Sequence, residues 1–407
     1  MDNTQYLYTL LLNRHNFYYS YLRIFLIFSS EKTEFNNLIK LNLHKLHLNN
    51  IELNDQINID NIDTYITIKK VMPKIFLLNG IYITSNNINK HITIKLITEK
   101  TGLKDFFEYN LHNNLNLFYI TNIVLFNKTI QILFNKRLNK NKKVYIINII
   151  TKNHEFIATK KHVIFNNETN NNIFDIYIAE TPNAILNTAL FLKINDKCNI
   201  NYNILSMNSG IFEHTFNIIS KQKSNCNLYF SDFHTDSTNI IVFYNFFLVG
   251  QRSIFKKTSF KNSKNTYTDK RICNIYHYAP ESKSTTLFGA LVDKNGKIIF
   301  EGNIIVGKDI KNVDAHLKCE GLLLATNINL EFNPNMFINN NDITCTHGVS
   351  IGNINVNIIN YMRSRGIYDS LCKKIFLTAF VKKYLCEKDP NFMSLYKKNL
   401  KIKSHYE

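Results

Sequence analysis

The sequence predicts a mainly β chain, and three observations lead to that fold class. From about residue 65 to 350, short runs of β-branched and aromatic residues are separated by Asn, Asp, Ser and Lys. Within such runs apolar and polar residues alternate, as in residues 91–96, which is the pattern of a half-buried strand. No helical stretch of convincing length separates the runs, so a sheet built from βαβ units is disfavoured.

Five further segments have the strand pattern: residues 117–126, 144–150, 173–178, 240–249 and 298–306. We therefore place a β core at residues 65–350. No fixed repeat period is visible, so periodicity by itself does not identify a solenoid. A sandwich, a barrel and a solenoid therefore all stay open on the pattern alone.

Helical regions are expected on both sides of this core, at residues 1–64 and 351–407. Residues 4–30 place leucines and aromatics at irregular three- and four-residue spacings, which indicates one or two helices. After Gly352, an apolar stripe of Ile354, Ile358 and Tyr361 predicts a helix that ends at Gly366. A second helix, capped by Asp369 or Ser370, carries an apolar face of Leu371, Ile375, Ala379 and Leu385.

The formal charge of +18 would suit a nucleic-acid or membrane surface. Asn, Ile and Lys dominate the composition, however, as expected when an A+T-rich genome favours lysine over arginine. The densest basic run, residues 136–143, lies between two apolar stretches, where a solvated turn is the simpler interpretation. No apolar run reaches the ~20 residues that a membrane-spanning helix needs. We therefore expect neither nucleic acid nor a membrane as partner.

Seven cysteines occur, and none forms a Cys-x-x-Cys pair or a regular framework. This usage is typical of reduced thiols in a cytosolic protein. The apolar stretch at residues 6–28 is broken by polar residues, and no small-residue cleavage site follows it, so no signal peptide is expected. A cytoplasmic location is the resulting prediction.

One segment near the end of the β core combines a thiol and an imidazole. It reads Asp342-Ile-Thr-Cys345-Thr-His347-Gly-Val-Ser-Ile-Gly352. If this segment is extended, side chains at i and i+2 emerge from the same face, so Cys345 and His347 can reach one metal ion or one edge of a cluster. The pattern makes both residues candidate metal ligands.

This segment resembles the SufD branch of the SufB/SufD family of iron-sulfur cluster assembly proteins. The branch pattern reads roughly Cys-Ser-His-Gly-Ala-Thr-Val-Gly followed by a Ser-Arg-Gly turn, which matches residues 345–352 and 364–366. The similarity continues through residues 284–296, 298–302, 322–324 and 379–380, about a quarter of the chain. SufB proteins have His-Glu-Ala where this chain has His347-Gly348-Val349, which favours the SufD branch.

The resemblance implies a right-handed parallel β-helix flanked by N- and C-terminal helical regions. It also implies a non-catalytic scaffold that pairs with SufB through the β-helix and docks the ATPase SufC on its C-terminal helices. We expect the same helices to close the open end of the β stack, which would otherwise expose strand edges. By the same resemblance, His347 and, more weakly, Cys345 are ligands of a transient iron-sulfur cluster or of iron at the SufB interface. Since a [4Fe-4S] cluster generally takes four protein ligands, the partner must supply the others. FAD on the assembled complex stays open, and no sequence feature supports it.

Absent motifs fit a scaffold without activity of its own. The nearest approach to a P-loop, residues 289–298, has six residues between its glycines and an isoleucine where a hydroxyl is needed, so ATP hydrolysis is assigned to SufC.

Two alternative functions stay open. One is a SufB-type scaffold that forms a homodimer. The other is a β-helical protein that binds or cleaves carbohydrate, although no cluster of carboxylates for acid-base work stands out.

Four further residues receive structural interpretations. His277 matches a histidine common in the family and is expected to be a satisfied structural residue near a turn. His316 and Cys319 are three apart, which puts them on opposite faces of a strand and argues against a shared metal. Asp342 is expected in an ordinary turn.

Overall fold

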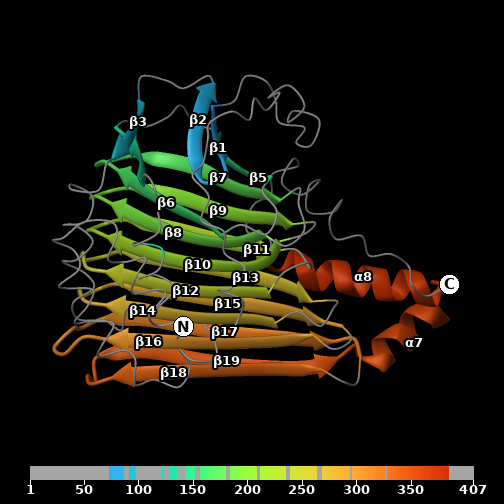
Figure 1. Cartoon of the computed structure of the whole chain (residues 1–407). Helices are drawn as coiled ribbons and strands as arrows, with labels where there is room; N and C mark the ends of the chain where they lie inside the picture. The colour runs from blue at the N-terminus through green and yellow to red at the C-terminus, as the bar shows by residue number, and fades with distance from the viewer. Residues whose placement is uncertain are drawn as a thin grey trace, which may run out of the picture.

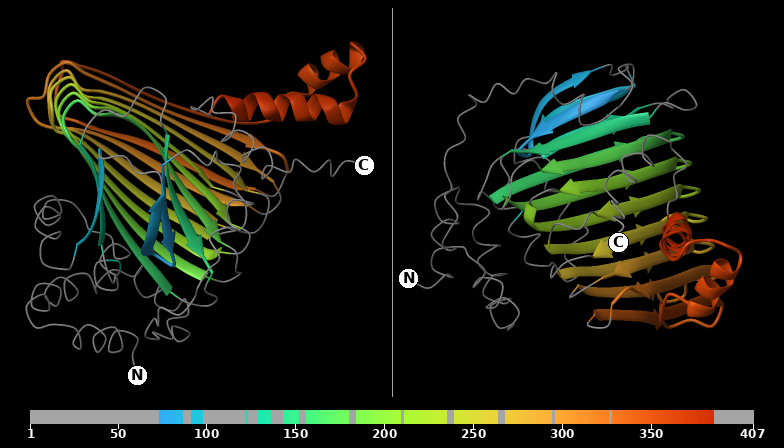
Figure 2. Two further views of the ribbon diagram at one scale, coloured as in Figure 1. Left: turned by 90° about the horizontal axis from the view of Figure 1, so that it is seen from above. Right: turned by 90° about the vertical axis from the view of Figure 1, so that its right-hand side faces the viewer.

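The computed structural model describes residues 73–86, 91–97, 122, 129–135, 143–151, 156–179, 184–208, 211–234, 239–263, 268–293, 296–325 and 328–384. Within them the chain is a β-solenoid followed by two helices (Figures 1 and 2). The strands are β1 (Lys74–Leu78), β2 (Ile81–Asn86), β3 (Ile92–Ile97), β4 (Thr129–Phe134), β5 (Lys143–Ile150), β6 (Phe156–Phe165), β7 (Asn170–Ala179), β8 (Ala184–Ile194), β9 (Asn199–Asn208), β10 (Ile211–Gln222), β11 (Asn227–His234), β12 (Asn239–Leu248), β13 (Ile254–Ser263), β14 (Thr268–His277), β15 (Lys283–Val292), β16 (Lys297–Val306), β17 (Val313–Leu323), β18 (Asn329–Ile338) and β19 (Ile343–Asn353). The helices are α7 (Val356–Ser364) and α8 (Asp369–Lys382).

From β4 onward successive strands alternate between two sheets, which makes each pair of strands one coil of the solenoid. The ten-stranded sheet has the order β19-β17-β15-β13-β11-β9-β7-β5-β1-β2, and the nine-stranded sheet has the order β18-β16-β14-β12-β10-β8-β6-β4-β3. From β4 to β19 every neighbouring pair is parallel, whereas β1 with β2 and β3 with β4 are antiparallel. The predicted β-helix with C-terminal helices is confirmed. The helical region predicted at residues 1–64 lies outside the described residues, as do residues 385–407 of the predicted C-terminal region, with Leu385.

The coils differ in length, which explains why the sequence shows no fixed period. Glu213 pairs with Asn239, 26 residues later, whereas Lys297 pairs with Asn329, 32 residues later. Most of the variation lies in the turns, and one further residue is inserted where the register of β10 against β8 shifts between Ile211 and Glu213. Of the predicted strand segments, residues 117–126 are described only at Asn122, which is not in a strand.

One turn of each coil contains a residue in the left-handed conformation. These residues are Glu168, Lys197, Asn225, Arg252, Glu281 and Asn312, with φ between 55° and 61°. Each donates its backbone N–H to a carbonyl of the following coil, as Lys197 does to Ser224 at 3.0 Å. Because only two of the six are asparagine, the stacking of the turns stabilises this conformation for residues that rarely adopt it alone.

The space between the sheets is mainly apolar but also contains a cluster of fully buried charges. Arg271 donates from Nη1 to Asp232 Oδ2 at 2.6 Å and from Nε to Asp269 Oδ1 at 2.7 Å. Lys257 Nζ lies 3.1 Å from Asp232 Oδ1, and Ser259 Oγ donates to Asp232 Oδ2 at 2.8 Å. Burial opposes the charged carboxylate, but Lys257 and Arg271 outweigh it and hold the pKa of Asp232 well below its usual range.

His277 is also fully buried, at the end of β14, and both of its ring nitrogens have hydroxyl partners. Nδ1 lies 2.7 Å from Ser282 Oγ, and Nε2 lies 2.9 Å from Ser284 Oγ. The interpretation as a satisfied structural histidine is confirmed. Burial lowers the pKa of His277 to about 4, because the charged imidazolium would lose its hydration there.

The two C-terminal helices lie beside the stack and not across its last coil (Figure 1). Leu377, Val381 and Tyr384 pack with Phe260, Leu291 and Leu322 on the outer face of the ten-stranded sheet. The role of closing the open end, expected for these helices, is therefore not the one that the described residues show: β18 and β19 remain largely exposed. Neither described helix is long and apolar enough to cross a membrane.

The end of α8 is held in place by a ring and an ion pair. The Tyr384 ring fills the space over Gly289, where an added Cβ would lie 2.6 Å from the ring atoms. Glu320 on β17 accepts from Tyr384 Oη at 2.5 Å and from Lys383 Nζ at 2.5 Å. These contacts fix the direction in which the helices leave the solenoid.

The predicted apolar faces of the helices are largely exposed, except that Ile354, which precedes α7, packs against the cluster on the outer face of the ten-stranded sheet. On α7 Ile358 and Tyr361 are 42% and 61% exposed, and the buried residue is Ile359. On α8 Leu371 and Ile375 are exposed, and the helix packs through Cys372, Leu377 and Val381 instead. Gly366 has φ 82°, as predicted for the residue after the first helix.

Replacing Arg271 with Met should lower the free energy of unfolding by roughly 3–5 kcal/mol, because Asp232 and Asp269 would keep buried charge without the guanidinium that contacts both. Urea denaturation of the full chain measures the loss. Arg252→Met is the matched control, since Arg252 pairs with Glu281 in an exposed ion pair and should change stability far less. Equal effects of the two substitutions would contradict the structural role of the buried cluster.

His277 should make the protein less stable as the pH falls from 6.5 toward 4. In that window the histidine of the unfolded chain binds a proton and the folded one, with a pKa of about 4, does not, so acid favours unfolding by about 1.4 kcal/mol per pH unit. In His277→Gln the slope of unfolding free energy against pH should decrease by about that amount. An unchanged slope between pH 6 and 4.5 would show that His277 does not stay neutral.

Candidate functional site

Cys345 and His347 lie on β19, the last strand of the ten-stranded sheet. Among the described residues β19 has a hydrogen-bonded neighbour on one side only, β17. The nine-stranded sheet ends in the same way at β18. The open end of the solenoid, defined as β18 and β19, therefore presents two strand edges that can accept further strands.

Both candidate ligands face the inside of the solenoid at this open end. In the register, Cys345 is level with Ala315 and His347 with Leu317, and both β17 partners are buried between the sheets. Cys345 is half-buried and packs against the core, whereas His347 is exposed because no further coil covers it. The expected extended segment with both side chains on one face is thus present.

The Cys345 and His347 side chains differ in how readily each could bind a metal ion. Burial raises the pKa of the Cys345 thiol, so it remains protonated at neutral pH unless a metal displaces the proton. His347 offers an accessible ring nitrogen. Within the described ranges, no group of three or more His, Cys, Asp or Glu side chains is arranged to hold a metal ion. The two candidate ligands on β19 are fewer than the four that a [4Fe-4S] cluster generally takes.

His316 and Cys319 do not meet. His316 points outward from β17, where Nε2 lies 2.7 Å from Asp314 Oδ1 and Nδ1 lies 2.6 Å from Thr346 Oγ1. Cys319 points inward and is fully buried. Their expected separation onto opposite faces is confirmed. Sequence spacing did not indicate the contact between His316 and Thr346, which ties the middle residue of the Cys345-Thr346-His347 segment to the preceding coil.

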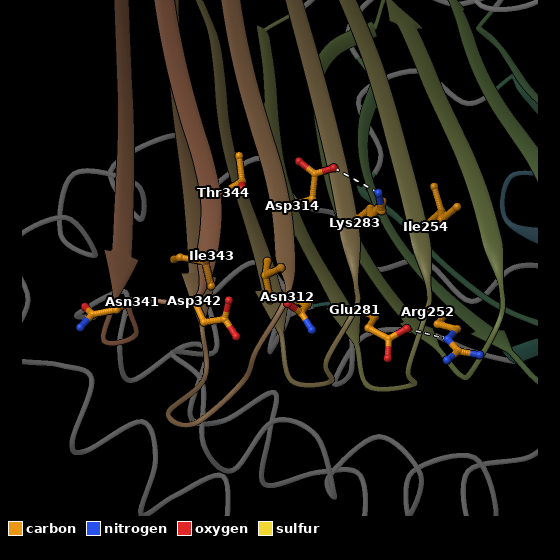
Figure 3. Close-up of a pocket in the computed structure, with 11 residues that line it drawn as sticks. Arg252, Ile254, Glu281, Lys283, Asn312, Asp314, Asn341, Asp342, Ile343 and Thr344 are labelled. Atoms are coloured by element: carbon orange, nitrogen blue, oxygen red, sulfur yellow. Dashed lines mark hydrogen bonds and ion pairs between the residues drawn. The ribbon is translucent and has the colours of Figure 1, made fainter.

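An open groove of about 720 Å³ runs over the turns near the open end (Figure 3). Its carboxylates are mostly paired with cations: Glu281 with Arg252 at 2.6 Å and Asp314 with Lys283 at 3.4 Å. Asp342 lies in a turn, and its carbonyl accepts from the Asn312 N–H at 2.9 Å, as expected for an ordinary turn residue. Paired carboxylates suit neither acid nor base catalysis of glycoside cleavage, so the groove gives the carbohydrate alternative little support.

The buried cluster around Arg271 was not found from the sequence. Asp269 and Arg271 are two residues apart in β14 and therefore share a face, but nothing in the pattern shows that this face is the interior. Residues in β14 alternate between buried and half-buried, and which set faces the interior can be assigned only when the neighbouring strands are known.

Comparison with known proteins identifies the family. The model for the SufBD core domain of SUF-system FeS cluster assembly matches residues 148–380, more than half of the chain. Iron-sulfur cluster assembly protein SufD of Escherichia coli is 28% identical over 117 residues, 29% of this chain and 27% of that protein. SufBD family proteins of Synechocystis and Staphylococcus haemolyticus are 24% and 22% identical over 101 and 113 residues, 25% and 28% of this chain and 22% and 24% of those proteins.

Each pairwise match thus spans about a quarter of the relative's length. The family match is broader, because it extends from β5 to α8 and includes the open end with Cys345 and His347. On that match, the chain belongs to the SufB/SufD family of iron-sulfur cluster assembly proteins.

Proposed function

We propose that the chain is a SufD-like scaffold subunit, which pairs with SufB through the open end of its solenoid and assembles an iron-sulfur cluster at the shared interface. The observation that carries the proposal is the incomplete ligand set on an unpaired edge strand: Cys345 and His347 lie on β19, where a second protein can reach them. A scaffold must release the cluster it builds, and a site with few ligands from each subunit suits that task.

The open end has the character of an interface. Met336, Phe337, Val349 and Ile351 are 37–57% exposed there. Edge strands of ten and eleven residues beside exposed apolar side chains favour the addition of strands from a partner. An assembly of two solenoids end to end would pair these edges and cover the apolar side chains.

The SufD role is preferred to the SufB-type role because of Gly348-Val349. At Gly348 no atom lies within 4 Å of the position that a Cβ would take, so packing does not require glycine there. A glutamate, as in SufB proteins, would fit the fold. The difference between the branches at this position is thus a matter of interface chemistry, and in this chain the position contributes no carboxylate.

ATPase activity is assigned to the partner SufC, docked on α7 and α8. The exposed apolar residues of the two helices are Val356, Ile358, Tyr361, Tyr368, Leu371 and Ile375. Exposed apolar side chains in this number on a short helical hairpin favour a protein partner. Tyr384 and Glu320 anchor the end of α8. A movement of the helices on binding SufC would therefore displace β17 and its neighbour β19.

We further propose a cytoplasmic location, on the basis of the reduced cysteines, and no binding to nucleic acid or membrane.

The proposal is tested by co-expressing the chain with SufB and SufC from the same organism and measuring native masses. A complex that contains one copy each of SufB and this chain, together with SufC, is expected. A homodimer of this chain that binds SufC without SufB would favour the SufB-type role. A monomer that binds neither protein would overturn the proposal.

His347→Ala should reduce iron-sulfur cluster formation on the assembled complex severalfold while the complex keeps its composition, because the exposed imidazole contributes to the shared site and not to packing. Cluster absorbance after anaerobic reconstitution and the activity of a dependent iron-sulfur enzyme in cells are the measurements. Cys345→Ala should have a smaller effect, since its thiol is half-buried and protonated. A larger effect of Cys345→Ala, or normal cluster formation in His347→Ala, would contradict these roles.

A further inference from the structure

Two cysteines remote from the open end lie on top of one another in the stack of coils. Cys198 comes directly before β9, and Cys226 directly before β11. Asn199 pairs with Asn227 in the parallel register, and the Asn227 N–H donates to the Cys198 carbonyl at 2.8 Å. Cys226 therefore occupies the position of Cys198 one coil further along.

From this geometry we propose that Cys198 and Cys226 form a reversible redox-modification site, at which peroxide converts the two thiols to a disulfide that joins neighbouring coils. The proposal goes beyond cluster assembly and involves neither Cys345 nor His347.

The spacing of the strands permits the bond. Neighbouring strands lie about 4.8 Å apart, and disulfides span Cα separations of roughly 4.4–6.8 Å. The two sulfurs are in contact with each other across the boundary between the coils. A disulfide can therefore form, and be reduced again, without a change in the strand register, as a reversible modification requires.

The surroundings give the two sulfurs different roles. In the thiol form each sulfur donates to a backbone carbonyl of the preceding coil, Cys198 to Asn166 at 3.1 Å and Cys226 to Asn195 at 2.7 Å. Contact with Cys226, followed by the Thr169 hydroxyl that donates to Cys198 at 3.3 Å, outweighs burial and lowers the pKa of Cys198 to about 6. The same contact raises the pKa of Cys226. Cys198 is then the nucleophile, and Cys226 the resolving thiol.

The other described cysteines lack this arrangement. In the strand register Cys273 lies level with Tyr244 and Gly302, and Cys319 with Phe288 and Val349, so neither has a cysteine at the same height in a neighbouring coil. Burial also raises the pKa of both thiols to about 12, and thiols react slowly with peroxide. Oxidation to a disulfide between neighbouring coils is therefore favoured at Cys198 and Cys226 over these two cysteines.

The reaction balances with hydrogen peroxide as the oxidant. The Cys198 thiolate attacks one peroxide oxygen, the O–O bond breaks, and the departing oxygen leaves as water after taking up a proton, which gives a sulfenic acid on Cys198. The Cys226 sulfur then attacks the Cys198 sulfur, and the hydroxyl leaves with the thiol proton as a second water. Two thiols and one peroxide become one disulfide and two waters.

Serine substitutions suit the test, because the structure itself has serine at the equivalent positions of the next two coils, Ser253 and Ser282. Both are fully buried, as Cys198 and Cys226 are. Cys198→Ser and Cys226→Ser should therefore fold, and circular dichroism checks this. Cys273→Ser is the matched control at a buried cysteine outside the pair.

The experiment treats the reduced, full-length chain with a small excess of hydrogen peroxide at neutral pH, blocks remaining thiols with N-ethylmaleimide, and maps peptides by mass spectrometry. The expected product has lost the mass of two hydrogens, carries a Cys198–Cys226 linkage, and returns to the starting mass with dithiothreitol. In Cys226→Ser the linkage should disappear, and dimedone should trap a sulfenic acid on Cys198. Cys273→Ser should behave as the unaltered chain.

Two results would overturn the proposal. One is oxidation confined to the other five cysteines, with Cys198 and Cys226 both still open to alkylation after unfolding. The other is a Cys198–Cys226 linkage that forms only in urea, because the folded chain would then be shown not to present the pair to peroxide.

Discussion

In-register stacking of parallel coils is the constraint on which the rest of this structure depends. Each strand from β6 onward takes its position from the strand two before it, so a residue's neighbours are the residues at the same height in the adjacent coils. Turns absorb the differences in coil length, and their left-handed residues are held by hydrogen bonds to the next coil. The contact of Cys198 with Cys226 and that of His316 with Thr346 both follow from this alignment.

Stacking also explains how the interior tolerates charge. A second buried pair lies several coils from Arg271: Lys161 Nζ is 2.6 Å from Asp175 Oδ1, and Tyr202 Oη donates to Asp175 Oδ2 at 2.8 Å. Taking such groups out of water is costly, and only well-placed partners offset the cost. A shift of register by one residue would turn Lys161 or Arg271 away from its carboxylates. Buried ion pairs of this kind therefore raise the free energy of misaligned strand pairings. A purely apolar interior would raise it less.

A solenoid differs from a closed globular fold in that its last coil has no successor. The strands β18 and β19 keep open edges, and the helices that follow pack on the side of the stack. Side chains that would be core residues in the middle of the stack become accessible at this end, and His347 is the clearest case, since it continues the column of buried Leu317. The same stacking that buries Arg271 thus exposes the candidate ligands, in the region where the family match and the proposed partner interface coincide.

The sequence by itself determined the strand content, the helices after Gly352, the shared face of Cys345 and His347 and, through the match of residues 345–352, membership of the SufB/SufD family. These depend on local pattern, because alternation and residue spacing fix which side chains share a face. Only the tertiary structure decided which strands are neighbours, since turns of varying length place partners 26 to 32 residues apart. For that reason the burial of His277, the charges around Arg271, the exposed apolar faces of α7 and α8, and the pairing of Cys198 with Cys226 were beyond the reach of pattern alone.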